Sequence, residues 1–154
     1  MAEIIPNEGL DLLLGIFPRG GTNLTTTYVG LFTGLTASTV PAQTAVLSTY
    51  GGAAFGESAF TGYARQSVAA ASWGAQAAGA GNAAGGRQST AAQASFPAAT
   101  ATYATAINGF FLADASAHGS EKAVFYANFD DTTAIASMAI GDVIKVTPTF
   151  GLLP

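Results

Sequence analysis

The pattern of hydrophobic positions changes near residue 22 and predicts one helix followed by strands. Four apolar side chains before that point recur at helical spacing and share one face: Leu10, Leu13, Leu14 and Phe17. Asn7 can cap the start of this helix, and Pro18 ends it. We expect a short helix that either packs on its own domain or docks on a neighbouring subunit.

Beyond residue 22, short runs rich in Thr, Val, Tyr and Phe alternate with Gly and Pro, which is typical of strands joined by turns. The predicted strands are residues 26–33, 61–73, 90–96, 107–113, 122–129 and 143–150. The run 107–113 is continuously apolar, so we expect it to be buried on both faces. The run 122–129 alternates, with Ala123, Phe125, Ala127 and Phe129 on one side and Lys122, Val124, Tyr126 and Asn128 on the other.

Two long connections separate the predicted strands. Residues 34–56 form a loop whose length is typical of functional or interfacial segments. Residues 74–86 are nearly all Ala and Gly, which predicts a flexible connection. The number and spacing of the strands favour an antiparallel sandwich or barrel over alternating strands and helices. We therefore expect a mainly β protein, with residues 1–21 as an N-terminal arm and 22–154 as a single sandwich domain.

Composition narrows the range of functions. The 154 residues suffice for one domain, and only 9% of them are charged, against about 25% in an ordinary soluble domain. The net charge of -4 argues against nucleic-acid binding, which needs clustered Lys and Arg. The absence of cysteine removes disulfides and thiol chemistry. The start of the chain carries no basic segment, and no long run of large apolar side chains occurs, so we expect neither a signal peptide nor a membrane span.

The scarcity of charge is uneven along the chain. Residues 20–56 carry no charge, whereas residues 114–145 hold half of the charged side chains. Charged residues are depleted at the centres of protein interfaces. We therefore expect a component of a symmetric assembly, with the uncharged stretches at contacts between chains and the charged stretches facing solvent.

Few residues suggest catalysis or metal binding. His118 is the one histidine, and a histidine close to serines in sequence does not make a catalytic triad. Four acidic residues could in principle hold calcium through oxygen ligands: Asp114, Glu121, Asp130 and Asp131. Adjacent aspartates more often hydrogen-bond to the backbone of a turn. Residues 79–84 fit a dinucleotide pattern outside its usual context. We expect no catalytic residue, no cofactor and no metal.

Five segments together resemble a group of small virion proteins of tailed bacteriophages. In order and spacing they cover almost the whole chain: residues 5–10 (IPNEGL), 28–33 (YVGLFT), 60–65 (FTGYAR), 109–114 (GFFLAD) and 141–148 (GDVIKVTP). The first and the last segments are the most specific combination. The resemblance implies a jelly-roll-like head decoration protein, also called a cement protein.

The resemblance further implies a location and partners. Such proteins lie on the outer capsid surface of the virion, after synthesis in the host cytoplasm, commonly as homotrimers that bridge subunits of the major capsid protein. We expect the contact surface to include the uncharged loops and seven residues of the N-terminal segment: Ile4, Ile5, Pro6, Leu10, Leu13, Leu14 and Phe17. No nucleic acid or membrane is expected as a partner.

Two other functions remain open. A structural module of the phage tail or baseplate would share the low charge. A carbohydrate-binding β-sandwich would need a cleft lined by aromatic and polar groups. Tyr63, Trp73 and Tyr103 are the candidate aromatic residues for such a cleft, although large aromatic side chains usually fill the core of a small sandwich.

Overall fold

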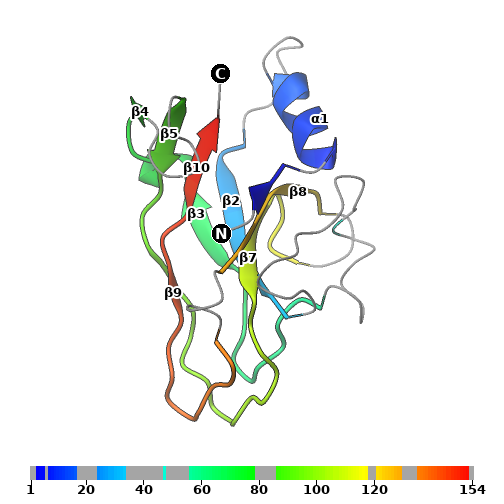
Figure 1. Ribbon diagram of the computed structural model, residues 1–154, viewed down its shortest axis with the longest axis vertical. Helices are drawn as coiled ribbons and strands as arrows, with labels where there is room; N and C mark the ends of the chain where they lie inside the picture. Colours follow the sequence, from blue (N-terminus) through cyan, green and yellow to red (C-terminus); the bar gives the residue numbers. More distant parts are fainter. Residues whose placement is uncertain are drawn as a thin grey trace.

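The computed structural model describes residues 3–5, 7–16, 24–33, 47, 56–78, 86–117, 121–129 and 135–152. Within these residues the chain is mainly β, with antiparallel sheets and one short helix, as the sequence predicts (Figure 1). In chain order the elements are β1 (Glu3–Ile4), α1 (Asn7–Ile16), β2 (Thr26–Phe32), β3 (Gln66–Ala69), the 3-10 turn η1 (Ala70–Ser72), β4 (Ala77–Ala78), β5 (Arg87–Thr90), β6 (Ala94–Ser95), β7 (Gly109–Ala113), β8 (Ala123–Asn128), β9 (Lys145–Val146) and β10 (Thr149–Leu152). No helix in this part of the chain is long and apolar enough to span a membrane.

The strands form a sandwich of two layers. One layer is a five-stranded sheet with the order β1-β8-β7-β2-β3. The other layer consists of a three-stranded sheet, β10-β5-β4, and a two-stranded sheet, β6-β9. A single hydrophobic core joins the layers, because Leu31 and Leu112 of the large sheet belong to the same buried cluster as Ala94 and Val146 of the small one. The predicted antiparallel sandwich with a short N-terminal helix is confirmed.

Two of the predicted strands are interrupted at the same level of the sandwich. The predicted strand 90–96 divides into the end of β5 and β6, and the predicted strand 143–150 divides into β9 and the start of β10. Pro148 lies at the second break and has no backbone N–H to donate. Its carbonyl oxygen instead accepts a hydrogen bond of 2.8 Å from the Ala91 N–H. At each break the chain passes between the three-stranded sheet and the two-stranded sheet.

The five-stranded sheet is covered on both faces. Val29, Leu31, Phe110 and Leu112 belong to the core between the layers. Phe32, Phe111, Ala113, Ala123 and Tyr126 form a second buried cluster together with Leu47. All five residues of β7 are buried, so the prediction that the apolar run 107–113 is buried on both faces is confirmed for this strand. β8 is buried on both sides as well, from Ala123 to Ala127, because its second face packs in the cluster that contains Leu47. The predicted alternation is wrong at the start of the strand: a register shift opposite Leu112 and Ala113 places Ala123 in the cluster with Tyr126 and Val124 in the core with Phe125.

A glycine allows close packing in the second cluster. Gly30 of β2 is paired with Phe111 of β7, and a Cβ atom at Gly30 would lie 2.1 Å from the end of the Phe111 ring. The Phe111 ring therefore lies directly over Gly30, in the space that the side chain of any other residue at position 30 would occupy. On the same face, the guanidinium carbon of Arg65 lies 5.1 Å from the centre of the Phe111 ring. Gly30 thus fixes the ring on which a charged group rests.

The N-terminal segment packs on its own sheet. β1 pairs with β8, with Glu3 opposite Ala127 and Ile4 opposite Tyr126. α1 also lies against β8, and a Cβ atom at Gly9 would lie 2.5 Å from the carbonyl oxygen of Val124. Residues 3–4, which the sequence analysis places in a separate arm, are therefore the edge strand of the large sheet. Of the two alternatives for the helix, the structure has the one in which it packs on its own domain.

Contact of the N-terminal segment with a partner stays a prediction. Ile5 packs against the main core of its own chain, and Leu10 is half-buried. Pro6, Phe17 and the side chains of Ile4, Leu13 and Leu14 lie outside the described residues.

Candidate functional site

Three charged side chains meet on the outer face of the five-stranded sheet. Glu57 forms an isolated bridge with Phe32 at the end of β2, Arg65 directly precedes β3, and Glu121 precedes β8. Their side chains are 16%, 2% and 0% exposed, respectively. The Arg65 guanidinium is 2.7 Å from the Glu57 carboxylate and 2.8 Å from that of Glu121. We call these three residues the charge cluster.

Every N–H group of the Arg65 guanidinium donates a hydrogen bond. Nε donates to Glu57 Oε1 at 2.8 Å, and Nη2 donates to Glu57 Oε2 at 2.7 Å and to Glu121 Oε1 at 2.8 Å. Nη1 donates to the carbonyl oxygens of Ala115 at 3.0 Å and Ala117 at 3.3 Å. Burial alone would lower the pKa of Arg65, but the hydrogen bonds to the two carboxylates outweigh it and raise the pKa above its ordinary value. Arg65 therefore stays charged with all five donors occupied.

Tyr63 extends the charge cluster toward β2. Its hydroxyl donates to Glu57 Oε1 at 2.7 Å and accepts a hydrogen bond of 3.0 Å from the Leu31 N–H. Burial, followed by the nearby negative charge of Glu57, raises the pKa of Tyr63 well above its ordinary value. The neutral phenol thus links the carboxylate to the backbone of the large sheet.

The raised pKa of Tyr63 predicts a loss of stability in alkaline solution. Its neutral form is favoured in the folded chain, so this contribution is fully present below the ordinary tyrosine pKa of about 10 and is lost as the pH rises above it. We expect the absorbance of ionised Tyr63 to appear only together with loss of the near-ultraviolet circular dichroism signal. The Tyr63→Phe variant should lack this component of the absorbance change. Ionisation of Tyr63 in a chain that keeps its native dichroism would contradict the prediction.

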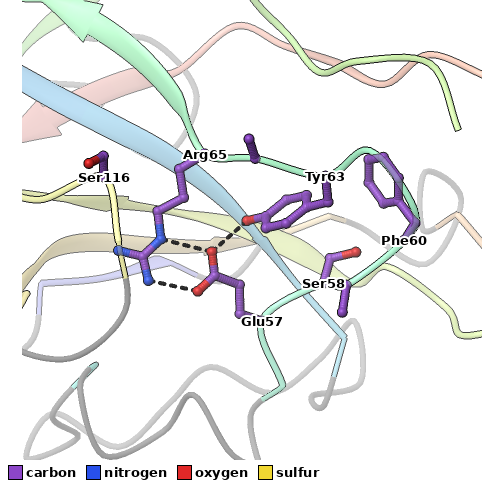
Figure 2. A pocket seen from close by; sticks show the side chains of 8 residues that line it. Glu57, Ser58, Phe60, Tyr63, Arg65 and Ser116 are labelled. Carbon is purple, nitrogen blue, oxygen red and sulfur yellow. Dashed lines mark hydrogen bonds and ion pairs between the residues drawn. The ribbon is translucent and has the colours of Figure 1, made fainter.

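Glu57 and Arg65 of the charge cluster form one wall of an open pocket of about 650 Å³. Its lining residues are Glu57, Ser58, Ala59, Phe60, Tyr63, Ala64, Arg65 and Ser116. Figure 2 shows Arg65 and Tyr63 converging on the Glu57 carboxylate, with Ser58 and Phe60 following Glu57 along the chain. Ser58 is 2% exposed, and its hydroxyl has no hydrogen-bond partner among the residues that the structure describes. The pocket therefore combines a preorganised polar wall with a buried, unsatisfied hydroxyl.

The structure separates the three candidate aromatic residues. Tyr63 lines the pocket beside the charge cluster. Tyr103 lies behind Phe60, with the two rings edge-on at 6.1 Å, and does not line the pocket. Trp73 borders a different pocket of about 270 Å³, together with Leu112 and Phe150. The three aromatic side chains do not form one platform.

Two of the four acidic residues considered as calcium ligands are described, and both are engaged within the protein. Glu121 pairs with Arg65, and Asp114 accepts a hydrogen bond from the Lys122 N–H at 2.7 Å. The described residues contain no group of three metal-ligating side chains. His118, Asp130, Asp131 and residues 79–84 lie outside the described residues.

The expectation that the charged stretch 114–145 faces solvent is wrong for Glu121, which is buried. Arg65, which lies outside that stretch, is buried as well. Sequence reasoning missed the charge cluster because 56 positions separate these two residues, and only the pairing of the strands brings them together. The separation of eight residues between Glu57 and Arg65 is no local signal either, because the turn at residues 61–62 lies between them. One indication was present: an arginine next to Tyr63 in a chain with so few charges is a candidate for a specific ion pair.

No protein-family model and no curated protein sequence matches the chain.

Proposed function

We propose that this protein is a structural protein of a bacteriophage virion, a decoration protein that binds the outer surface of the head and bridges subunits of the major capsid protein. The resemblance of its five segments to such proteins supports the proposal. The observation that carries it is the chemistry of the exposed surface. That surface is suited to contact with another protein and offers few charged groups.

Charged residues are rare on the exposed surface of the described chain. In the described part of the chain, five charged residues are exposed: Asp11, Arg87, Lys122, Asp142 and Lys145. Most other exposed positions are Ala, Gly, Ser or Thr. Such side chains lose little conformational entropy when a partner covers them, and the desolvation penalty for charges is avoided. Assembly as a homotrimer would multiply weak contacts of this kind into durable attachment.

One end of the sandwich is the most apolar part of this surface. Ile140 is 70% exposed and Val143 is 47% exposed, and both lie in the turn before β9. The turn is held in place, because Gly141 N–H donates to Ala99 O at 2.8 Å and Ala139 N–H donates to the Asp142 carboxylate at 2.7 Å. We call the exposed turn around Ile140 and Val143 the apolar tip. It lies at the end of the molecule opposite α1 and the C-terminus (Figure 1).

The proposal predicts that head binding depends on the apolar tip. Replacing Ile140 or Val143 by aspartate buries a charge at the contact, so we expect the affinity for heads that lack this protein to fall by about tenfold or more. Co-sedimentation with such heads, purified from the phage whose genome carries the gene, measures the affinity. The control is Ala92→Asp, at an exposed position between β5 and β6. Binding that is unchanged in both tip variants would contradict this placement of the contact.

Antibody labelling of intact virions distinguishes the head from the tail. Labelling over the head surface is expected, labelling confined to the tail or baseplate would favour that alternative, and the absence of label on the particle would contradict a virion role. Deletion of residues 1–17 is a poor test of the N-terminal contact, because it removes β1 and α1 from their own sheet.

A further inference from the structure

A second pocket, of about 270 Å³, opens between the two layers of the sandwich. Its lining residues are Thr27, Leu112 and Val124 of the five-stranded sheet, Ser89 and Phe150 of the three-stranded sheet, and Trp73 and Gln76 before β4. We call it the interlayer pocket. We propose that it binds a small carboxylate with an apolar body, which lies between the layers while the carboxylate pairs with Arg87. This site is independent of head attachment, because it includes no residue of the apolar tip.

The interior of the interlayer pocket is apolar. Leu112 and Val124 belong to the buried core between the layers, and the partly buried side chains of Trp73 and Phe150 pack against that core. The surface that the lining residues leave open is therefore mostly carbon. A dry apolar cavity of about 150 Å³ is large enough to bind benzene. The interlayer pocket accordingly has room for one ring, or a short chain of similar size, together with a small head group.

Arg87 lies at the edge of this pocket. Successive residues of a strand point to opposite faces, so Arg87 shares one face of β5 with Ser89, which lines the pocket. Ala91 continues that face and is buried in the core, which identifies it as the inner face of the three-stranded sheet. Arg87 Nη2 also donates to the carbonyl oxygen of Gln76, another lining residue, at 2.8 Å. Two independent observations therefore place the guanidinium beside the apolar interior.

The free donors of Arg87 select a carboxylate. One of its N–H groups donates to Gln76, and no ion pair is recorded for it among the described residues, so its other donors can form charge-assisted hydrogen bonds with a carboxylate. No acidic side chain lines the pocket. A cation would be repelled by Arg87, and a neutral compound would gain apolar contact alone. The net charge of -4 opposes an anion only weakly, because exposed charges more than about 8 Å apart are largely screened at physiological salt.

Titration of the ¹⁵N-labelled full chain, followed by nuclear magnetic resonance, tests the proposal with four defined probes. Phenylacetate has a ring and a carboxylate, 2-phenylethanol and 2-phenylethylamine keep the ring with a neutral or a cationic group, and acetate lacks the ring. Trp73 is the one tryptophan of the chain, so its indole N–H gives a single signal. We expect phenylacetate to shift this signal and the amide signals of Gln76 and Ser89 saturably.

The four probes should bind in a fixed order. An exposed ion pair contributes at most about 1 kcal/mol, which corresponds to about fivefold in affinity. Phenylacetate should therefore bind about fivefold more tightly than 2-phenylethanol, 2-phenylethylamine should bind most weakly of the ring compounds, and acetate should cause no saturable shift. Absence of a saturable Trp73 shift with phenylacetate, equal binding of the three ring compounds, or saturable binding of acetate would overturn the proposal.

Two matched substitutions locate the carboxylate. Arg87→Met removes the guanidinium from the edge of the pocket, so phenylacetate should bind about fivefold more weakly, with the affinity for 2-phenylethanol unchanged. Lys145→Met removes an exposed cation from the two-stranded sheet and should leave the affinity for both compounds unchanged. Unchanged phenylacetate binding in Arg87→Met, or an equal loss in Lys145→Met, would contradict the pairing with Arg87. None of these results depends on whether the protein binds phage heads.

Discussion

Replacing Arg65 by methionine should lower the free energy of unfolding by about 3–5 kcal/mol, because it leaves two carboxylates buried without a counter-charge. Methionine keeps much of the apolar length of the side chain, so the change tests charge more than packing. The Arg65 side chain is 2% exposed and the Glu121 side chain 0%, so solvent cannot replace the lost partner. Urea unfolding followed by circular dichroism measures the effect.

Arg87→Met is the matched control for this prediction. Arg87 is exposed and donates to the Gln76 carbonyl oxygen at 2.8 Å, with no ion pair recorded for it in the described part of the chain. Its replacement should change stability by less than about 0.5 kcal/mol. Arg65→Lys should fail to restore stability, because an ammonium group has three donors and cannot reach five acceptors. A loss below about 1 kcal/mol in Arg65→Met would mean that the cluster is no stronger than an exposed ion pair.

Replacing Phe111 by alanine should cost about 3–5 kcal/mol, the range for removing a buried aromatic side chain. The Phe111 ring is fully buried between Gly30 and the Arg65 guanidinium, so its loss opens a cavity and removes the surface on which the guanidinium rests. Phe150→Ala is the control, because Phe150 is only partly buried, at the edge of the core between the two layers. Its cost in urea unfolding should be clearly smaller.

The close contact between Gly30 and Phe111 makes their substitutions non-additive. Gly30→Ala alone should destabilise the protein by about 1–3 kcal/mol, because the new methyl group overlaps the ring. In the Phe111→Ala background the same substitution enters empty space, so its cost should disappear. A double-mutant cycle measured by urea unfolding gives the coupling directly. Additive effects would show that the ring moves away from the glycine without cost.

The sequence was sufficient for the fold class because its signals are local. The apolar run over 107–113 and the helical spacing of apolar residues near the N-terminus are each set by residues close together in the sequence. The structure has both elements, β7 and α1. The interruptions of the strands near Ala91 and Pro148 were harder to predict. They depend on which strand lies opposite, and a proline alone does not show whether a strand ends there or continues in another sheet.

The candidate site could not be predicted, because its residues come from segments that are distant along the chain. Tyr63 was among the aromatic candidates, but nothing near it in the sequence shows that Glu57 and Glu121 would surround Arg65. The alternation in β8 likewise does not reveal that its second face is covered, since Leu47, which packs there, lies far away in the sequence. Long-range pairing therefore determines the chemistry of the site, whereas local spacing determines the elements.

The short edge strands of the large sheet limit how copies of this protein can associate. β1 has two residues and covers part of β8, and the opposite edge, β3, has four. An edge strand this short exposes few unpaired backbone groups to another chain, which is how many β proteins avoid edge-to-edge aggregation. Extension of the sheet from one copy to the next is therefore disfavoured, and the protein can be crowded on a surface at high local concentration without growing into fibres.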